Sequence, residues 1–89
     1  MTMTNRGLAK LTEECGELIQ VAAKKTAYMC GPHPDGNGDL DRRLEDEIAD
    51  VIAACQFVLG EFGLDQERVN ERAQDKLSCF HVWHNDPSA

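Results

Sequence analysis

Basic residues are scarce in this chain, which has nine Lys and Arg against sixteen Asp and Glu and a net charge of −7 at pH 7. Binding to a nucleic-acid backbone requires a basic patch, so the composition argues against nucleic acid as a partner. The same acidity would repel the phosphate groups of a small ligand. A bound divalent cation would reverse that charge locally.

Long apolar runs and closely paired cysteines are also missing. No stretch approaches the roughly 18–20 apolar residues that span a bilayer, and residues 1–6 lead into a charged amphipathic pattern rather than a signal peptide. The four cysteines include no C-x₂-C pair of the kind found in zinc knuckles and redox motifs. We therefore expect a cytoplasmic protein with reduced thiols and no membrane partner.

The chain instead has a strong helical periodicity, and no alternating strand pattern competes with it. Apolar residues in steps of three and four predict helices at about 4–29, 40–60 and 66–81. Residues 30–39 hold three Gly and two Pro and predict a flexible loop. Residues 85–89 predict a frayed tail. The 89 residues, 1–89, are expected to form a single domain.

Helix starts and apolar faces follow from the same pattern. Asp39 or Asp41 is suited to cap the second helix and Asp65 the third. The predicted apolar faces are Leu8, Leu11, Cys15, Leu18 and Ala22 on the first helix, and Val69, Ala73, Leu77 and Phe80 on the third. Such faces are wide for one small monomer. We expect an all-α antiparallel helical bundle of about three helices per chain, completed by dimerisation as a homodimer or a dimer of dimers.

Two pairs of carboxylates have matched spacing. Glu14 and Glu17 are three residues apart in the first predicted helix, and Glu47 and Asp50 are three apart in the second. Residues at this spacing share a helix face, and Glu14 lies about 40° from Leu18, beside the apolar stripe. The two pairs would converge if the helices packed antiparallel. A single acidic residue on a helix is usually just solvated, so the matched pairs carry the inference.

Four converging carboxylates conflict with one another unless something neutralises them. Mutual repulsion and desolvation would raise their pKa values and favour protonation. A hard divalent cation removes the conflict because it prefers oxygen ligands. Oxygen donors without His favour Mg²⁺, with Mn²⁺ as a substitute, over Zn²⁺.

The same residues carry a resemblance to a known family. Residues 11–18, LTEECGEL, resemble the E-E-x-x-E helix of the MazG-like all-α nucleoside triphosphate pyrophosphohydrolases, and residues 44–51, LEDEIADV, resemble their E-x-x-D helix. Residues 62–65, followed by Val69 and Lys76, resemble the turn and third helix of that family. The resemblance extends over about residues 7–80. It implies a dimeric or tetrameric helical bundle that hydrolyses nucleoside triphosphates, often deoxynucleotides, to the monophosphate and pyrophosphate.

The resemblance also implies roles for single residues. The implied site comprises Glu14, Glu17, Glu47 and Asp50 as metal ligands, Glu13 and Glu14 as catalytic residues, and Lys76 and Arg72 as substrate-binding residues. Trp83 is a further substrate-binding candidate, because its aromatic ring is suited to stack on a base. Glu13 points about 100° away from Glu14, which suits it to orient a ligand or activate water. Removal of unwanted nucleotides from the cellular pool is the biological role that the family suggests.

Other side chains have two interpretations. Lys24 and Lys25 follow the first motif and are candidates for phosphate contacts. Arg43 is a further candidate, or it pairs with Asp46 or Glu47 at helical spacing. Phe57, Tyr28 and Phe80 join Trp83 as aromatic candidates for a base pocket, although core or interface packing is the commoner role of such residues.

Two alternative functions remain open, and a third is disfavoured. A non-catalytic helical dimer with a regulatory role would keep the bundle without binding Mg²⁺. A superfamily relative acting on phosphoribosyl-ATP would share the chemistry and differ in substrate. A di-iron carboxylate bundle is disfavoured, because it requires Glu-x-x-His pairs and neither Glu17 nor Glu47 has a His three residues later.

Overall fold

Three helices account for most of the chain in a computed structural model that describes residues 5–86. The helices are α1 (Leu8–Ala27), α2 (Leu40–Phe62) and α3 (Gln66–Asn85). Within residues 5–86 there is no strand, so the all-α prediction is confirmed. The predicted tail falls partly in α3, which includes Asn85, and partly in residues 87–89, which lie outside the described part.

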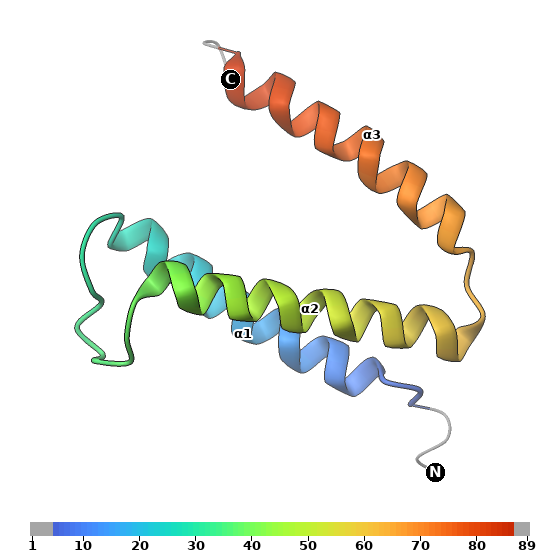
Figure 1. Cartoon of the computed structure of the whole chain (residues 1–89), viewed down its shortest axis with the longest axis horizontal. Helices are drawn as coiled ribbons and strands as arrows, with labels where there is room; N and C mark the ends of the chain where they lie inside the picture. The colour runs from blue at the N-terminus through green and yellow to red at the C-terminus, as the bar shows by residue number, and fades with distance from the viewer. Residues whose placement is uncertain (1–4, 87–89) are drawn as a thin grey trace.

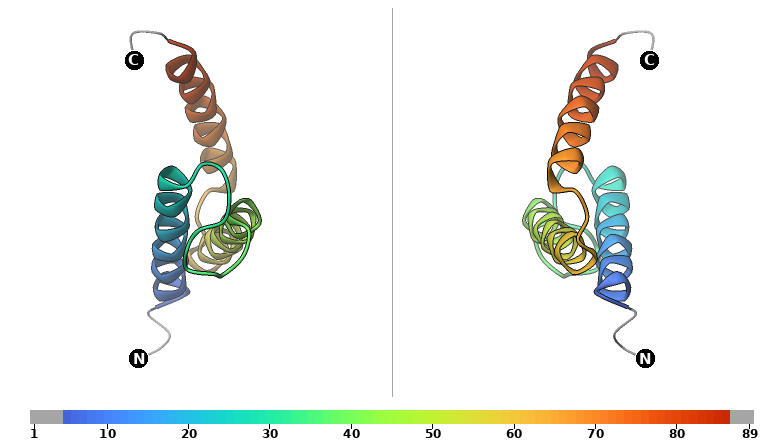
Figure 2. Two further views of the ribbon diagram at one scale, coloured as in Figure 1. Left: turned by 90° about the vertical axis from the view of Figure 1, so that its left-hand side faces the viewer. Right: turned by 90° about the vertical axis from the view of Figure 1, so that its right-hand side faces the viewer.

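Helices α1 and α2 form an antiparallel pair and lie side by side along much of their length (Figures 1 and 2). Their interface supplies the buried apolar residues of the described chain, which are Val21, Leu40, Ala54 and Val58. The stripe predicted for α1 is only partly buried: Leu11, Cys15 and Leu18 are half-buried, whereas Leu8 and Ala22 are exposed. Because α2 is the one helix that packs on α1 within residues 5–86, it covers a narrow strip of the α1 surface. This strip is centred nearer Val21 than the predicted apolar stripe.

The ends of the helices follow local rules. The Asp39 carboxylate accepts a hydrogen bond from the Arg42 backbone N–H at 3.1 Å, and the Asp65 carboxylate accepts one from the Arg68 N–H at 3.1 Å. Both aspartates are therefore N-caps. Helix α2 runs two residues beyond its predicted end because Gly63, with φ of 62°, forms the left-handed C-cap.

The start of α1 is set by a glycine. Gly7 has φ of 89°, which places it in the left-handed region and ends the helix in the N-terminal direction. The helix predicted from about residue 4 therefore begins at Leu8. A Cβ atom at Gly7 would lie 2.5 Å from Cδ2 of Phe57, so the absence of a side chain also lets the start of α1 approach α2.

Helix α3 turns away from the α1–α2 pair after the short connection 63–65 (Figure 1). None of its residues, all of them in the described part, is buried. Its predicted apolar face is exposed, with Val69 at 43%, Leu77 at 48% and Phe80 at 53%. Within residues 5–86, the chain therefore forms a two-helix pair and an extended third helix. The completion of the expected bundle by dimerisation stays a prediction.

Over residues 5–86, no helix combines the length and the apolar character that crossing a membrane requires.

Candidate metal centre

The four carboxylates with matched spacing lie together at the interface of the helix pair. Glu14 and Glu17 come from α1, and Glu47 and Asp50 come from α2. One carboxylate oxygen from each residue lies within 4.8 Å of those from the other three. The i, i+3 spacing puts each pair on one face of its helix, and the antiparallel packing of α1 on α2 turns the two faces toward each other. We refer to these residues as the carboxylate cluster.

Burial and like charge act together on two members of the cluster. Desolvation, reinforced by the charges of Glu17 and Asp50, raises the pKa of Glu14 above its ordinary value of 4.5. The same causes in the same order raise the pKa of Glu47, to which Glu14 also contributes. The ionised forms of these two residues are therefore disfavoured by their surroundings.

The cluster also contains unsatisfied acceptors. Within the described residues, Oε2 of Glu14 and Oε2 of Glu47 are buried and have no hydrogen-bond partner. A buried polar atom without a partner is costly and is rare in native structures. A divalent cation would supply the missing partner and remove the repulsion at the same time.

The donor set fits Mg²⁺. All four side chains offer oxygen, which is the ligand that this hard cation prefers. Three of the residues are half-buried and Asp50 is exposed. This leaves one side of the cluster open to water or to phosphate oxygens, as Mg²⁺ requires because it usually keeps several exchangeable ligands.

An open cavity of about 450 Å³ adjoins the cluster. Glu14 and Asp50 form one part of its wall, and the remaining lining residues are Gly7, Lys10, Ala53, Ala54 and Phe57. Its size falls within the range of small-molecule sites. The small side chains of Ala53 and Ala54 leave the space, and the Phe57 ring provides an aromatic surface beside it.

Glu13 lies next to the cluster without belonging to it. Its Oε2 accepts a hydrogen bond from Lys10 Nζ at 3.2 Å, and both side chains are more than half exposed. That hydrogen bond and the charge of Glu13 raise the pKa of Lys10. Lys10 also lines the cavity, which makes it a candidate site residue that the sequence motifs did not single out. Its position four residues before Glu14, on the same helix face, was the signal that would have found it.

The substrate-binding candidates Arg72, Lys76 and Trp83 lie on α3. Lys76 Nζ is 5.8 Å from the centroid of the Trp83 ring, close enough for a cation–π contact. Arg72 and Lys76 line a separate depression of about 310 Å³ formed by α3 residues alone. Because α3 stands away from the helix pair (Figure 2), a single chain does not bring these three side chains to the carboxylate cluster.

The remaining basic candidates bind other partners. Lys25 Nζ lies 2.7 Å from Oδ1 of Asp41. Within residues 5–86, the guanidinium of Arg43 binds Asp35 of the preceding loop rather than Asp46 or Glu47. Helical spacing could not indicate this pairing, because Asp35 lies outside both helices.

No protein-family model, curated protein or solved structure matches this chain.

Proposed function

We propose that this chain is a Mg²⁺-dependent nucleoside triphosphate pyrophosphohydrolase of the MazG-like kind, acting on nucleoside and above all deoxynucleoside triphosphates. The observation that carries the proposal is the convergence of Glu14, Glu17, Glu47 and Asp50 at one helix interface. Two of the four residues hold buried oxygens without a partner. The resemblance of residues 11–18 and 44–51 to the family motifs, which contain the same four carboxylates, supports the same conclusion.

Each residue of the site would have a distinct role. The cluster would hold Mg²⁺, which neutralises phosphate charge and aligns the leaving pyrophosphate. A carboxylate that is not fully committed to the metal, Glu13 or Glu14, would accept a proton from the attacking water. No covalent intermediate is required.

The cavity beside the cluster is the proposed place of the nucleoside. The Phe57 ring would stack on the base. Lys10 would lie close to the phosphate groups, where its ammonium group would neutralise negative phosphate charge that the metal does not. This arrangement would put the reacting phosphates next to Glu14 and Asp50, which line both the cavity and the cluster.

We further propose that the active form is an oligomer of at least two chains. Large apolar side chains are exposed on every helix, among them Ile19 at 68%, Ile52 at 52% and Trp83 at 53%. Burying such residues against a second copy is favourable. In an oligomer, α3 of one chain would be able to cover the site of another, which would bring Arg72, Lys76 and Trp83 to the substrate.

The enzymatic proposal is tested by pyrophosphate release. The purified protein is incubated with Mg²⁺ and a panel of canonical and modified nucleoside triphosphates, with phosphoribosyl-ATP included. We expect turnover of at least one compound and a loss of about 100-fold or more in Glu14→Gln and Glu47→Gln. Glu45→Gln, a change of the same kind at an exposed position on α2, is the matched control and should keep full activity.

The main alternative is a non-catalytic dimerisation or regulatory module, which the exposed apolar faces also support. It is favoured if no compound in the panel is cleaved and Mg²⁺ leaves the thermal stability unchanged. Preferred turnover of phosphoribosyl-ATP would instead support the superfamily relative.

A further inference from the structure

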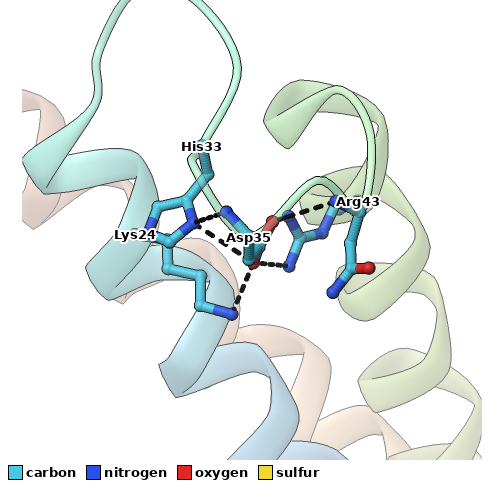
Figure 3. A network of polar contacts seen from close by, with 5 residues as sticks. Lys24, His33, Asp35 and Arg43 are labelled. Atoms are coloured by element: carbon cyan, nitrogen blue, oxygen red, sulfur yellow. Dashed lines mark hydrogen bonds and ion pairs between the residues drawn. The ribbon is translucent and has the colours of Figure 1, made fainter.

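A single carboxylate fastens the loop between α1 and α2. Asp35 accepts a hydrogen bond from Lys24 Nζ of α1 at 2.9 Å. The guanidinium of Arg43 on α2 binds the same carboxylate in a bidentate manner, with NH1 3.2 Å from Oδ1 and NH2 3.2 Å from Oδ2 (Figure 3). Two cations from two helices thus converge on the two oxygens of one loop residue.

The cationic side chains are well enclosed. Their exposed fractions are 31% for Lys24 and 19% for Arg43, and that of the Asp35 side chain is 19%. The hydrogen bond from Lys24, together with further donors that include Asn37 N–H and Arg43, holds the pKa of Asp35 well below its usual range. The carboxylate is therefore bound as an anion in a preformed set of donors.

The loop that carries Asp35 has few other attachments. As whole residues, 28–39 are exposed apart from His33, although the Asp35 side chain itself is enclosed. The Nδ1 atom of His33 accepts a hydrogen bond from the Asp35 N–H at 3.0 Å. The ring of His33 also meets Tyr28 edge-on, with the ring centroids 4.7 Å apart. A segment with so little buried apolar surface opens locally at low cost. Besides a hydrogen bond from Lys25 Nζ to the Met29 carbonyl at 2.9 Å, the ion pairs to Lys24 and Arg43 attach this loop to the helices.

The two cations lie on the helix faces that carry the carboxylate cluster. Lys24 is seven residues after Glu17, which is close to two full helical turns. Arg43 is four residues before Glu47 and seven before Asp50, and so lies one to two turns from them. At 1.5 Å per residue the offsets along the axes are about 6–10 Å. The cationic pair therefore lies one to two helical turns from the cluster along the same two helices.

We propose that Lys24 and Arg43 form an anion-binding site for phosphate groups, and that Asp35 occupies this site as an internal competitor until the loop opens. An Arg fork with a neighbouring ammonium group is a donor set that binds phosphate oxygens as well as carboxylate oxygens. Displacing Asp35 exposes two positive charges in an otherwise acidic chain. The anion site itself is independent of the proposed function. The further statement that the bound phosphate belongs to a nucleotide rests on the proposed function.

The test measures binding of inorganic pyrophosphate by calorimetry with a chelator present, so that neither metal nor turnover contributes. We expect Asp35→Asn to bind at least about tenfold more tightly than the wild type, because the competing carboxylate is gone and the site is fully available. In Asp35→Asn/Arg43→Gln the gain should disappear. Asp41→Asn removes the same charge from the partner of Lys25, and serves as the matched control with an expected change of less than about twofold.

A second arm uses a deoxynucleoside triphosphate in the same buffer. Tightening for both probes means that the site takes phosphate groups from either source, and tightening for the nucleotide alone assigns the site to the nucleotide. Asp35→Asn binding neither probe more tightly than the wild type overturns the proposal, as does a gain that survives Arg43→Gln. Circular dichroism of each variant shows that the comparison is between folded proteins. Tight binding of pyrophosphate by Asp35→Asn, combined with no pyrophosphohydrolase activity in the wild-type protein, would leave the anion site standing and remove the proposed function.

Discussion

Glu14 and Glu47 face the same interface from opposite helices, and each has a buried Oε2 atom without a hydrogen-bond partner in the described chain. Two carboxylates in such a position weaken the packing of α1 on α2, because each loses hydration and is repelled by its neighbours. A hairpin selected for stability alone would carry apolar residues here. The cost is understandable if the site has a function, since functional sites are commonly built at the expense of stability.

Mg²⁺ should stabilise the protein. A ligand that binds only the folded state adds about 2.7 kcal/mol at a concentration of 100 Kd. For a domain of this size, each kcal/mol raises Tm by about 4–8 °C. Differential scanning fluorimetry with Mg²⁺ and with a chelator measures the shift. The double variant Glu14→Gln/Glu47→Gln should show none, and a wild-type protein that is equally indifferent to Mg²⁺ would contradict the metal centre.

Removal of one carboxylate should raise stability and lower activity together. In the metal-free protein, Glu47→Gln keeps the side-chain shape and relieves the repulsion from Glu17, Asp50 and Glu14, so its Tm should exceed that of the wild type. Its pyrophosphate release should fall by about 100-fold or more. Chemical denaturation and the nucleotide assay are compared on the same preparation, with Glu45→Gln as control. A Glu47→Gln protein less stable than the metal-free wild type would show that the side chain stabilises the interface.

The stability of the metal-free protein should depend on pH in a characteristic way. Because the pKa values of Glu14 and Glu47 are raised in the folded state, that state binds more protons than the unfolded chain at pH values just above 4.5. The free energy of unfolding therefore rises as the pH falls through the raised pKa values toward 4.5. Urea denaturation across this range measures the slope. In Glu14→Gln/Glu47→Gln the slope of stability against pH should be flatter. In the wild type, the affinity for Mg²⁺ should fall as the pH falls over the same range, because the carboxylate ligands must be ionised.

Asp35 should act in the opposite direction at lower pH. Its pKa lies below the ordinary value of 3.8, so the folded state binds fewer protons than the unfolded chain once the pH falls to that region. The contribution of the Asp35 ion pairs to the free energy of unfolding is complete above the ordinary pKa of 3.8 and is lost as the pH falls further. Asp35→Asn should be less stable than the wild type at neutral pH and lose less stability on acidification. Parallel denaturation curves with Asp41→Asn as control test this, and identical acid slopes in the wild type and Asp35→Asn would count against the ion-pair network.

Gly7 should tolerate no side chain. Its φ of 89° is strained for any other residue, and a Cβ atom would meet the Phe57 ring. Gly7→Ala should therefore cost about 1–3 kcal/mol of stability and disturb the cavity that both residues line. Gly60→Ala, inside α2 with no atom within 4 Å of the added Cβ, should instead stabilise by about 0.8–1 kcal/mol. Thermal denaturation of the two variants gives the comparison, and equal effects would remove the special role of Gly7.

Self-association should depend on the exposed apolar residues of α2. Ile52 is 52% exposed, and Ile52→Glu would place a charge in the proposed interface, where it lacks compensation. Light scattering coupled to size exclusion should show an oligomer for the wild type and a monomer for Ile52→Glu. Gln66→Glu adds the same charge at an exposed polar position at the start of α3 and should leave the oligomer intact. A monomeric wild-type protein would end the proposal that α3 serves a neighbouring chain.

The sequence by itself determined the helices, the cap at Asp65 and the two i, i+3 carboxylate pairs, and it narrowed the cap of the second helix to Asp39 or Asp41. These features depend on residues within about one helical turn, so periodicity and side-chain capping are sufficient to predict them. The same local logic placed Glu14 beside the apolar stripe and Glu13 away from it. It was less accurate for helix ends, because the left-handed residues Gly7 and Gly63 decide where α1 starts and α2 stops.

Tertiary structure alone decided how these elements meet. The packing of α1 against α2 brings the carboxylate pairs within 4.8 Å and leaves the cavity beside Phe57, and the loop between them delivers Asp35 to Lys24 and Arg43. Such relationships depend on helix register and on the path of a Gly- and Pro-rich loop, neither of which helical periodicity encodes. The separation of α3 from the pair has the same origin: its apolar face is visible in the sequence, whereas the surface that could cover it is absent from the folded chain over residues 5–86.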